Sequence, residues 1–169
     1  MNNLSKFDES LLPTEEFSVC ITGNRLVTNQ DILKIKEVIY KLVTNSKIEE
    51  IYFGGAIGTD TIALQAALDV VCLDKPELIA VVPDTHKSQP LEARDALFKA
   101  DQLIELRNQI TQNDGYRSYQ IRNEYMVDHS IVTVAFWDNT IKSGTYNCLA
   151  YALKNNKIVL HVEIEGKDK

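Results

Sequence analysis

The 169-residue sequence has little that would point to a membrane, exported or disulfide-bonded protein. It contains no run of about 18 apolar residues that could cross a bilayer. Residues 1–15 include acidic side chains and lack an apolar segment of signal-peptide length. Its three cysteines, Cys20, Cys72 and Cys148, form no C-x-x-C pair. We therefore expect a cytoplasmic chain with buried free thiols, one that folds without disulfides or metal and has no membrane partner.

Positive charge and metal-ligand patterns are also scarce. The sequence holds 18 Lys and Arg against 24 Asp and Glu, which gives a net charge of −6. A general nucleic-acid footprint needs a basic face, so we do not expect nucleic acid as a partner. His86, His129 and His161 are scattered, without the spacing of a metal-ligand pair. Neither a metal site nor a cofactor is predicted.

Apolar runs rich in β-branched and aromatic residues alternate with helical patterns along the chain. We expect strands at 17–22, 48–53, 78–82, 103–106, 131–137 and 157–162, and helices at 29–43, 59–73, 91–100, 116–129 and 143–154. Runs such as "IAVV" and "IVTVAFW" are nearly continuously apolar, which is typical of a parallel sheet covered on both faces by helices. The sequence predicts a Rossmann-like, doubly wound α/β domain over residues 16–163, with a mostly parallel sheet of five to six strands. Residues 1–15 are expected to form an N-terminal extension and residues 164–169 a C-terminal tail.

Glycines gather at the predicted carboxyl edge of this sheet, where doubly wound folds bind their ligands. Gly23, Gly54 and Gly55 follow strands, whereas Gly58 and Gly144 open helices. Such turns let a ligand approach the backbone, and helix N-termini suit phosphate. "GGAIGT" matches neither the dinucleotide fingerprint nor the P-loop, which argues against ATP hydrolysis. The "GGAIGT" and "KSGT" turns together suggest two ends of one anionic ligand, although strand-to-helix turns also use glycine for geometric reasons alone.

The predicted helix over 116–129 carries the most informative charge. Tyr119, Arg122 and Asn123 share one helical stripe, so a guanidinium and an amide project side by side. Arginine suits phosphate, and the amide could read a ribose hydroxyl or a base edge; a solvated arginine is the alternative. Asp60 lies in a first helical turn, where capping is the simpler role. The candidate ligand-binding residues are Gly23, Asn24, Arg25, Gly54, Gly55, Ala56, Gly58, Thr59, Asp60, Arg122, Asn123, Ser143, Gly144 and Thr145.

These motifs resemble those of a known group of proteins. "FGGAIGTD" followed by "TIALQAAL" is similar to the S-G-G-A-R-G-x-D turn and helix of the DprA/Smf and YpsA proteins of the Rossmann-like SLOG group. The segment from "IRNEYMVDHS" to "KSGTYNCLAYA" resembles the second half of the LOG branch, the cytokinin-activating phosphoribohydrolases. This resemblance implies that Arg122 corresponds to the arginine that contacts the LOG substrate and serves catalysis, and that Asn123 replaces a lysine. It also implies that Gly144 and Thr145 are the phosphate-binding pair.

The departures from the group are specific. Cys148 falls where LOG proteins carry a catalytic glutamate, and Ile57 stands where the DprA-like motif has arginine. The "TIKSGT" segment also lacks the preceding Gly-Gly pair. The resemblance therefore implies a retained binding scaffold without the hydrolase carboxylate, and no catalytic residue is assigned.

We expect binding of a nucleotide or nucleotide-derived phosphorylated ligand by a sensor, carrier or sequestering protein. The alternative is a LOG-like hydrolase of nucleoside monophosphates in which Asp60 or another carboxylate replaces the glutamate. DprA-like binding of single-stranded DNA ranks third because of the net negative charge. Since SLOG relatives are often assemblies, the resemblance also implies a homodimer or higher homo-oligomer.

Overall fold

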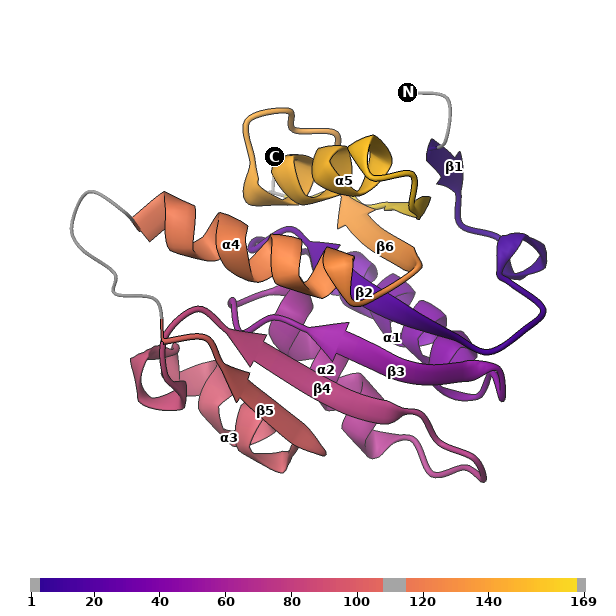
Figure 1. The fold of residues 1–169 in the computed structure, drawn as a ribbon, viewed down its shortest axis with the longest axis horizontal. Coiled ribbons are helices and arrows are strands. Elements are labelled where there is room, and N and C mark those ends of the chain that lie inside the picture. Colours follow the sequence, from indigo (N-terminus) through magenta and orange to yellow (C-terminus); the bar gives the residue numbers. More distant parts are fainter. Residues whose placement is uncertain (1–3, 108–114, 167–169) are drawn as a thin grey trace.

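A computed structural model describes residues 4–107 and 115–166. Seven strands form one wholly parallel sheet in the order β1-β7-β6-β2-β3-β4-β5, and the strand arrows in Figure 1 point toward the same edge. The strands are β1 (Leu4–Lys6), β2 (Phe17–Gly23), β3 (Ile48–Phe53), β4 (Glu77–Val82), β5 (Gln102–Glu105), β6 (Val132–Trp137) and β7 (Ile158–Glu163). The chain moves outward from β2 to β5 and then returns to β6 beside β2. The order therefore reverses between β2 and β6, which is where doubly wound folds place their ligand crevice.

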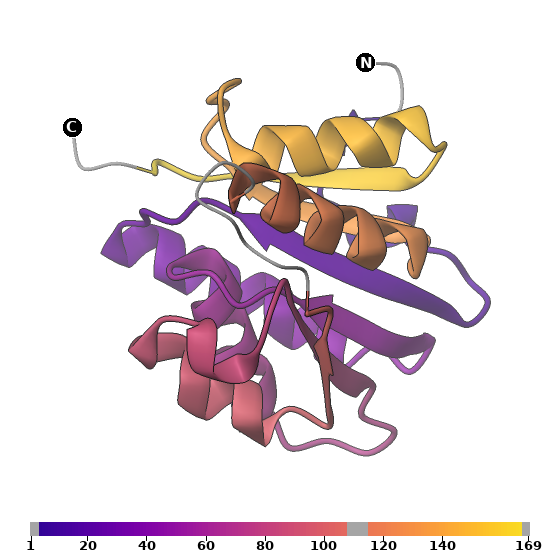
Figure 2. The ribbon, with the colours of Figure 1, turned by 60° about the vertical axis from the view of Figure 1, so that its left-hand side comes forward.

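Helices cover both faces of the sheet (Figures 1 and 2). One face carries α1 (Asn29–Val43), α2 (Thr59–Asp69) and α3 (Leu91–Lys99), and the other carries α4 (Gly115–Asp128) and α5 (Gly144–Lys154). Short 3-10 turns occur at Glu9–Leu11 and His86–Ser88. Right-handed crossover connections account for this arrangement. Successive strands are added in one direction from β2 to β5 and in the other from β6 to β7, and a reversal of direction moves the connecting helices to the opposite face of the sheet. The expected Rossmann-like doubly wound architecture is thus confirmed.

Each face has its own apolar core. Ile35 and Ile39 of α1 pack with Leu64 of α2 on one side, while Met126 of α4 and Leu149 of α5 pack on the other. All five side chains are almost completely buried. Burying a side chain of this size contributes roughly 1.5–3 kcal/mol, so the periodic apolar positions account for the attachment of these helices to the sheet.

The sheet has one strand more than the five to six expected. The additional strand, β1, pairs in parallel with β7, with Leu4 opposite Val159 and Lys6 opposite His161. Three residues are too few to show the alternation or apolar run that reveals a strand in a sequence. Their pairing depends on the edge of β7, which is assembled from the other end of the chain.

Helix α2 ends at Asp69, four residues before the predicted boundary. The backbone of Val70 is extended, and Val71 and Leu73 are almost fully exposed. The apolar residues that suggested a longer helix therefore do not contribute to the core. None of the helices within the described residues has the length and apolar character needed to cross a membrane.

Candidate functional site

The loop after β2 and the turn after β3 form one unit at the carboxyl edge of the sheet. The backbone N–H and the hydroxyl of Thr59 both donate to the carbonyl oxygen of Asn24, at 3.0 and 2.9 Å. Gly58 has a φ of +78°, and a Cβ there would overlap the backbone of Arg25. A Cβ at Gly23 would likewise collide with the side chain of Thr59. The glycines thus permit the close approach of the two segments.

Gly54 lies between two buried charged groups. A Cβ at this position would lie 2.5 Å from Oδ2 of Asp60 and 2.7 Å from Nη1 of Arg122. Asp60 comes from the first turn of α2 and Arg122 from α4, so the two groups reach Gly54 from opposite faces of the sheet. Three elements far apart in the sequence therefore meet at the first glycine turn.

Arg122 is only 4% exposed but makes few hydrogen bonds with the other residues that the structure describes. Its Nε donates to Oδ1 of Asn123 at 2.8 Å, and Nη1 makes a long contact of 3.5 Å with the carbonyl of Val81. No ion pair joins it to a carboxylate in the part of the chain that the structure describes. A guanidinium has five N–H donors, so most of its hydrogen-bonding capacity remains available beside Gly54.

Asp60 is also buried, and its carboxylate accepts a hydrogen bond from the N–H of Ala56 at 3.2 Å. Burial raises the pKa of Asp60 above its ordinary value, and the positive charges of Arg122 and Arg25 and the Ala56 hydrogen bond only partly oppose this. Ionised Asp60 therefore carries a free-energy cost in the folded protein. Perturbed carboxyl groups of this kind are concentrated at functional sites.

Replacing Asp60 with asparagine is expected to raise the melting temperature near pH 7 by about 2–4 °C, the change that roughly 1 kcal/mol makes in a chain of this size. Because the folded pKa is raised, the contribution of Asp60 to stability is complete below the pKa of the unfolded chain and is lost as the pH rises through the folded pKa. Thermal melts from pH 3 to 8 should show the gain disappearing in acid. Asp69→Asn, at the exposed end of the same helix, is the control, and a lower melting temperature for Asp60→Asn at pH 7 would contradict the expectation.

Asn24 extends the site toward β6. Its backbone N–H donates to the carbonyl of Phe136 at 3.1 Å, while its side-chain Oδ1 is buried without a hydrogen-bond partner among the described residues. Burial raises the pKa of nearby Asp138, but hydrogen bonds from the side chain of Asn24 and from Thr140 outweigh it, so the pKa of Asp138 lies below its usual range. The β2–β6 edge therefore presents acceptors.

The second Gly-Thr turn lies at the same edge of the sheet but leads into α5, on the face opposite α2. Ser143 caps this helix by accepting a hydrogen bond from the N–H of Tyr146 at 3.1 Å. Thr145 is buried, whereas the space around the Gly144 Cα is open to 4 Å. No hydrogen bond between described residues joins the 143–145 turn to the 54–60 turn. The two turns are similar in sequence but differ in their packing.

Cys148, at the position of the LOG glutamate, is fully buried beneath this turn. Its interaction with Cys20 and its burial raise the pKa of the Cys148 thiol well above the ordinary value. A buried neutral thiol supplies neither a carboxylate nor a thiolate nucleophile. In the described residues, moreover, no cluster of three or more His, Cys, Asp or Glu side chains could hold a metal ion.

Two further residues join the site although they were not among the predicted ligand-binding residues. Tyr119 lies beside both guanidinium groups, with its ring centroid 5.3 Å from Cζ of Arg25 and 5.8 Å from Cζ of Arg122. Gln89 is buried with Oε1 2.8 Å from the position of a Cβ on Gly55. Tyr119 could have been found from its place one helical turn before Arg122. Gln89 follows a 3-10 turn and has no periodic signal.

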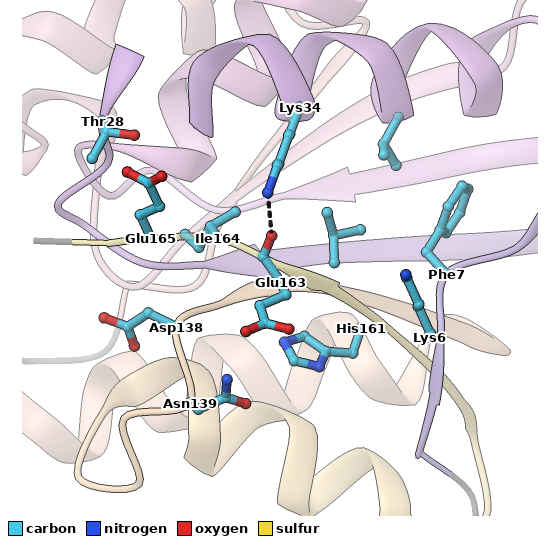
Figure 3. Close-up of a pocket in the computed structure, with 12 residues that line it drawn as sticks. Lys6, Phe7, Thr28, Lys34, Asp138, Asn139, His161, Glu163, Ile164 and Glu165 are labelled. Carbon is cyan, nitrogen blue, oxygen red and sulfur yellow. Dashed lines mark hydrogen bonds between the residues drawn. The ribbon is translucent and has the colours of Figure 1, made fainter. Parts of the chain in front are cut away.

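A separate groove of about 920 Å³ lies between α1, the end of β7 and the end of β1 (Figure 3). Charges of both signs line it, including Lys6, Lys34, Glu163 and Glu165, and Nζ of Lys34 donates to the carbonyl of Glu163 at 3.2 Å. None of the predicted ligand-binding residues lines this groove. The candidate site is therefore a different region of the same edge.

No protein-family model matches the chain. It is 29% identical over 151 residues to the uncharacterized SPbeta prophage-derived protein YoqJ of Bacillus subtilis, an alignment that covers 75% of this chain and 84% of YoqJ. Among solved structures, DNA processing protein A of Helicobacter pylori superimposes with a TM-score of 0.68 at 22% identity, over 95% of this chain and 72% of that one. The Helicobacter pylori protein has a unique single-stranded DNA binding mode.

This chain has the same Rossmann-like fold as the Helicobacter pylori protein. DprA of Streptococcus pneumoniae shares this fold and matches with a TM-score of 0.66 at 19% identity over 86% of this chain and 50% of that one. The molybdenum cofactor binding protein of Rippkaea orientalis matches with a TM-score of 0.64 at 20% identity, over 89% of this chain and 78% of that one. At these identities the similarity establishes the fold, and function has to be inferred from the site itself.

Proposed function

We propose that this protein binds a nucleotide or nucleotide-derived phosphorylated ligand at the carboxyl edge of its sheet, as a sensor, carrier or sequestering protein. The observation that carries the proposal is Arg122, a buried guanidinium with unused donors and no ion pair among the described residues. Asp60 lies across Gly54 from Arg122 but forms no ion pair with it, so a bound phosphate would gain charge-assisted hydrogen bonds from donors that Arg122 leaves unused among the described residues.

The surroundings of Arg122 support an anion rather than a neutral ligand. Helix α2 begins at Thr59, and its N-cap residue Gly58 has no side chain that could cap it. The N–H of Thr59 donates to Asn24, and those of Asp60 and Thr61, which make no hydrogen bond within the described residues, are available for a phosphate. Gly54 and Gly55 are buried, and the space where each would carry a side chain is occupied by Asp60 and Arg122 and by Gln89. Exposed Arg25 adds a second cation at the same turn. Helix α1, in contrast, is closed by a capping box between Thr28 and Asp31.

The second turn is proposed to hold the other end of the ligand. Gly144 is open on its Cα side, and the N–H groups at the start of α5 point toward the same edge of the sheet. Asn24 and Asn123 carry amides suited to sugar hydroxyls or a base edge, and the amide oxygen of Asn123 already accepts from Nε of Arg122.

Hydrolysis of an N-glycosidic bond is the alternative that the site must be tested against. Proton transfer by a placed acid or base is typically worth about 10²- to 10⁴-fold in rate, and Cys148 cannot provide it. Asp60 is the carboxyl group nearest to Arg122 across Gly54. We propose binding rather than efficient turnover, because Asp60 is already engaged by the N–H of Ala56.

Replacing Arg122 with alanine is expected to weaken binding of a nucleoside monophosphate by roughly ten- to a hundredfold, because a hydrogen bond to a charged group contributes about 1.5–3 kcal/mol. Native mass spectrometry of freshly purified protein would first reveal co-purified nucleotide. Calorimetry with AMP, GMP, CMP and UMP would then give affinities for the wild-type and variant proteins.

Lys99→Ala provides the charge-matched control, because Lys99 makes a surface ion pair with Asp95 on α3. Unchanged affinity in Arg122→Ala would remove Arg122 from the site. Chromatography of the same mixtures follows free base, and robust release that Asp60→Asn abolishes would establish the hydrolase alternative. Binding of single-stranded oligonucleotides without binding of monophosphates would favour the DprA-like alternative.

A further inference from the structure

We infer that the ligand carries an aromatic ring that stacks on Tyr119, so that the site selects a base-bearing phosphate over a phosphorylated sugar. This inference rests on the proposed function and assigns one part of the ligand to one residue. Tyr119 is an aromatic side chain that lies against both site arginines. It belongs to neither of the glycine turns and would not itself hold a phosphate.

Tyr119 lies nearer the surface of the site than Arg122 does. Its side chain is 37% exposed, whereas Arg122 beside it is 4% exposed. Both guanidinium carbons lie within 6 Å of the ring centroid, the range of cation–π attraction. A ligand whose phosphate lies at Arg122 therefore has the exposed Tyr119 ring beside it.

The two arginines have different freedom to respond to that ligand. Arg122 is fixed by its hydrogen bond to Asn123 and by burial. Arg25 lies in the loop after β2 and is exposed, and its guanidinium makes no ion pair with a carboxylate of the described residues. When Arg25 turns toward a bound phosphate, it leaves the tyrosine ring, and an aromatic base can take its place on that ring.

Stacking on an aromatic residue is worth roughly ten- to a hundredfold in affinity for each base, and a sugar phosphate gains none of it. The ring of Tyr119 also has a purely structural alternative role, which is to shield the buried guanidinium of Arg122 from water. The two roles differ in what a leucine at this position would do. Leucine retains an apolar cover over Arg122 but offers no π-face.

Calorimetry with AMP, GMP, CMP, UMP and ribose 5-phosphate tests the inference on wild-type protein, Tyr119→Leu and Tyr119→Phe. We expect Tyr119→Leu to weaken the best monophosphate by about ten- to a hundredfold while leaving ribose 5-phosphate unchanged. Tyr119→Phe should stay within about threefold of wild type for both ligands. Melting curves confirm that each variant is folded.

Equal loss of both ligands in Tyr119→Leu, or no loss of either, would overturn the stacking role while leaving phosphate binding in place. Wild-type protein that binds ribose 5-phosphate as tightly as every monophosphate would overturn it as well. If wild type binds none of these compounds, the proposed function fails, and the inference fails with it. A loss of affinity in Tyr119→Leu that is confined to the base-bearing ligand supports both the proposed function and the stacking role of Tyr119.

Discussion

Replacing Gly58 with alanine is expected to lower the free energy of unfolding by about 3–5 kcal/mol, with contributions from backbone strain and overpacking. Gly58 has φ +78° and ψ −126°, a conformation that residues with a Cβ rarely adopt. The added methyl group would also overlap the backbone carbonyl of Arg25. Neither problem can be relieved without separating the β2 loop from the start of α2.

Gly144→Ala is the matched control, because it also precedes a threonine at the start of a helix. Its Cα faces open space and its φ is not positive, so alanine should be neutral or stabilising by up to about 1 kcal/mol. Urea unfolding measures both variants. At about 2–4 °C per kcal/mol, Gly58→Ala should melt some 6–20 °C lower than wild type. Equal stability of the two variants would show that glycine is not required more strongly at position 58 than at position 144.

Replacing Asp31 with asparagine is expected to cost about 2–4 kcal/mol of stability, because a buried carboxylate that satisfies several backbone donors would be lost. Asp31 accepts hydrogen bonds from the N–H groups of Thr28, Glu165 and Gly166, at 2.9, 2.8 and 2.9 Å. It thereby caps α1 and fixes the end of the chain beside it. The amide of asparagine would turn one of these acceptors into a competing donor.

The effect of Asp31 should depend on pH. Burial raises its pKa, but the backbone hydrogen bonds from Thr28, Glu165 and Gly166 outweigh burial, so the folded pKa lies below the ordinary value. The stabilisation is therefore present above the unfolded pKa of about 3.9 and is lost as the pH falls through the folded pKa. Urea unfolding from pH 3 to 7 should show wild type approaching Asp31→Asn in acid. Asp95→Asn, on the surface of α3, should change stability little at any pH, and a constant difference across this range would contradict the assignment.

Much of the fold can be predicted from local pattern. The expected strand at 48–53 is β3 as observed, and the helix at 29–43 has the predicted bounds because Thr28 and Asp31 form a capping box before a regular apolar stripe. The predicted elements differ from the observed ones where tertiary contacts determine whether a strand forms or where a helix ends. Strand β1 forms because it pairs with the edge of β7. Helix α2 stops at Asp69 because Val71 and Leu73 have no core surface to pack against and stay exposed.

The candidate site divides in the same way. The residues of the first turn and the helical stripe of Arg122 could be proposed from sequence, since each belongs to a short motif. That Asp60 and Arg122 meet at Gly54 could not, because they are 62 positions apart and reach it from opposite faces. Gln89 illustrates the limit, because its place depends on packing against Gly55 and on the hydrogen bond that Nε of Arg94 donates to its carbonyl oxygen.

Local sequence is sufficient to specify the alternation of strands and helices, the all-apolar strands of a buried parallel sheet, and the glycine turns at one edge. These features depend on residues within a few positions of one another, so periodicity and turn chemistry reveal them. Packing in three dimensions is needed to establish that Gly58 is sterically required while Gly144 is not, and that Arg122 is buried without a carboxylate partner in the described residues. The Gly-Thr sequence is identical in both turns, so it cannot distinguish them. Steric overlap and desolvation depend on the residues that the fold brings into contact, and these differ between the two turns.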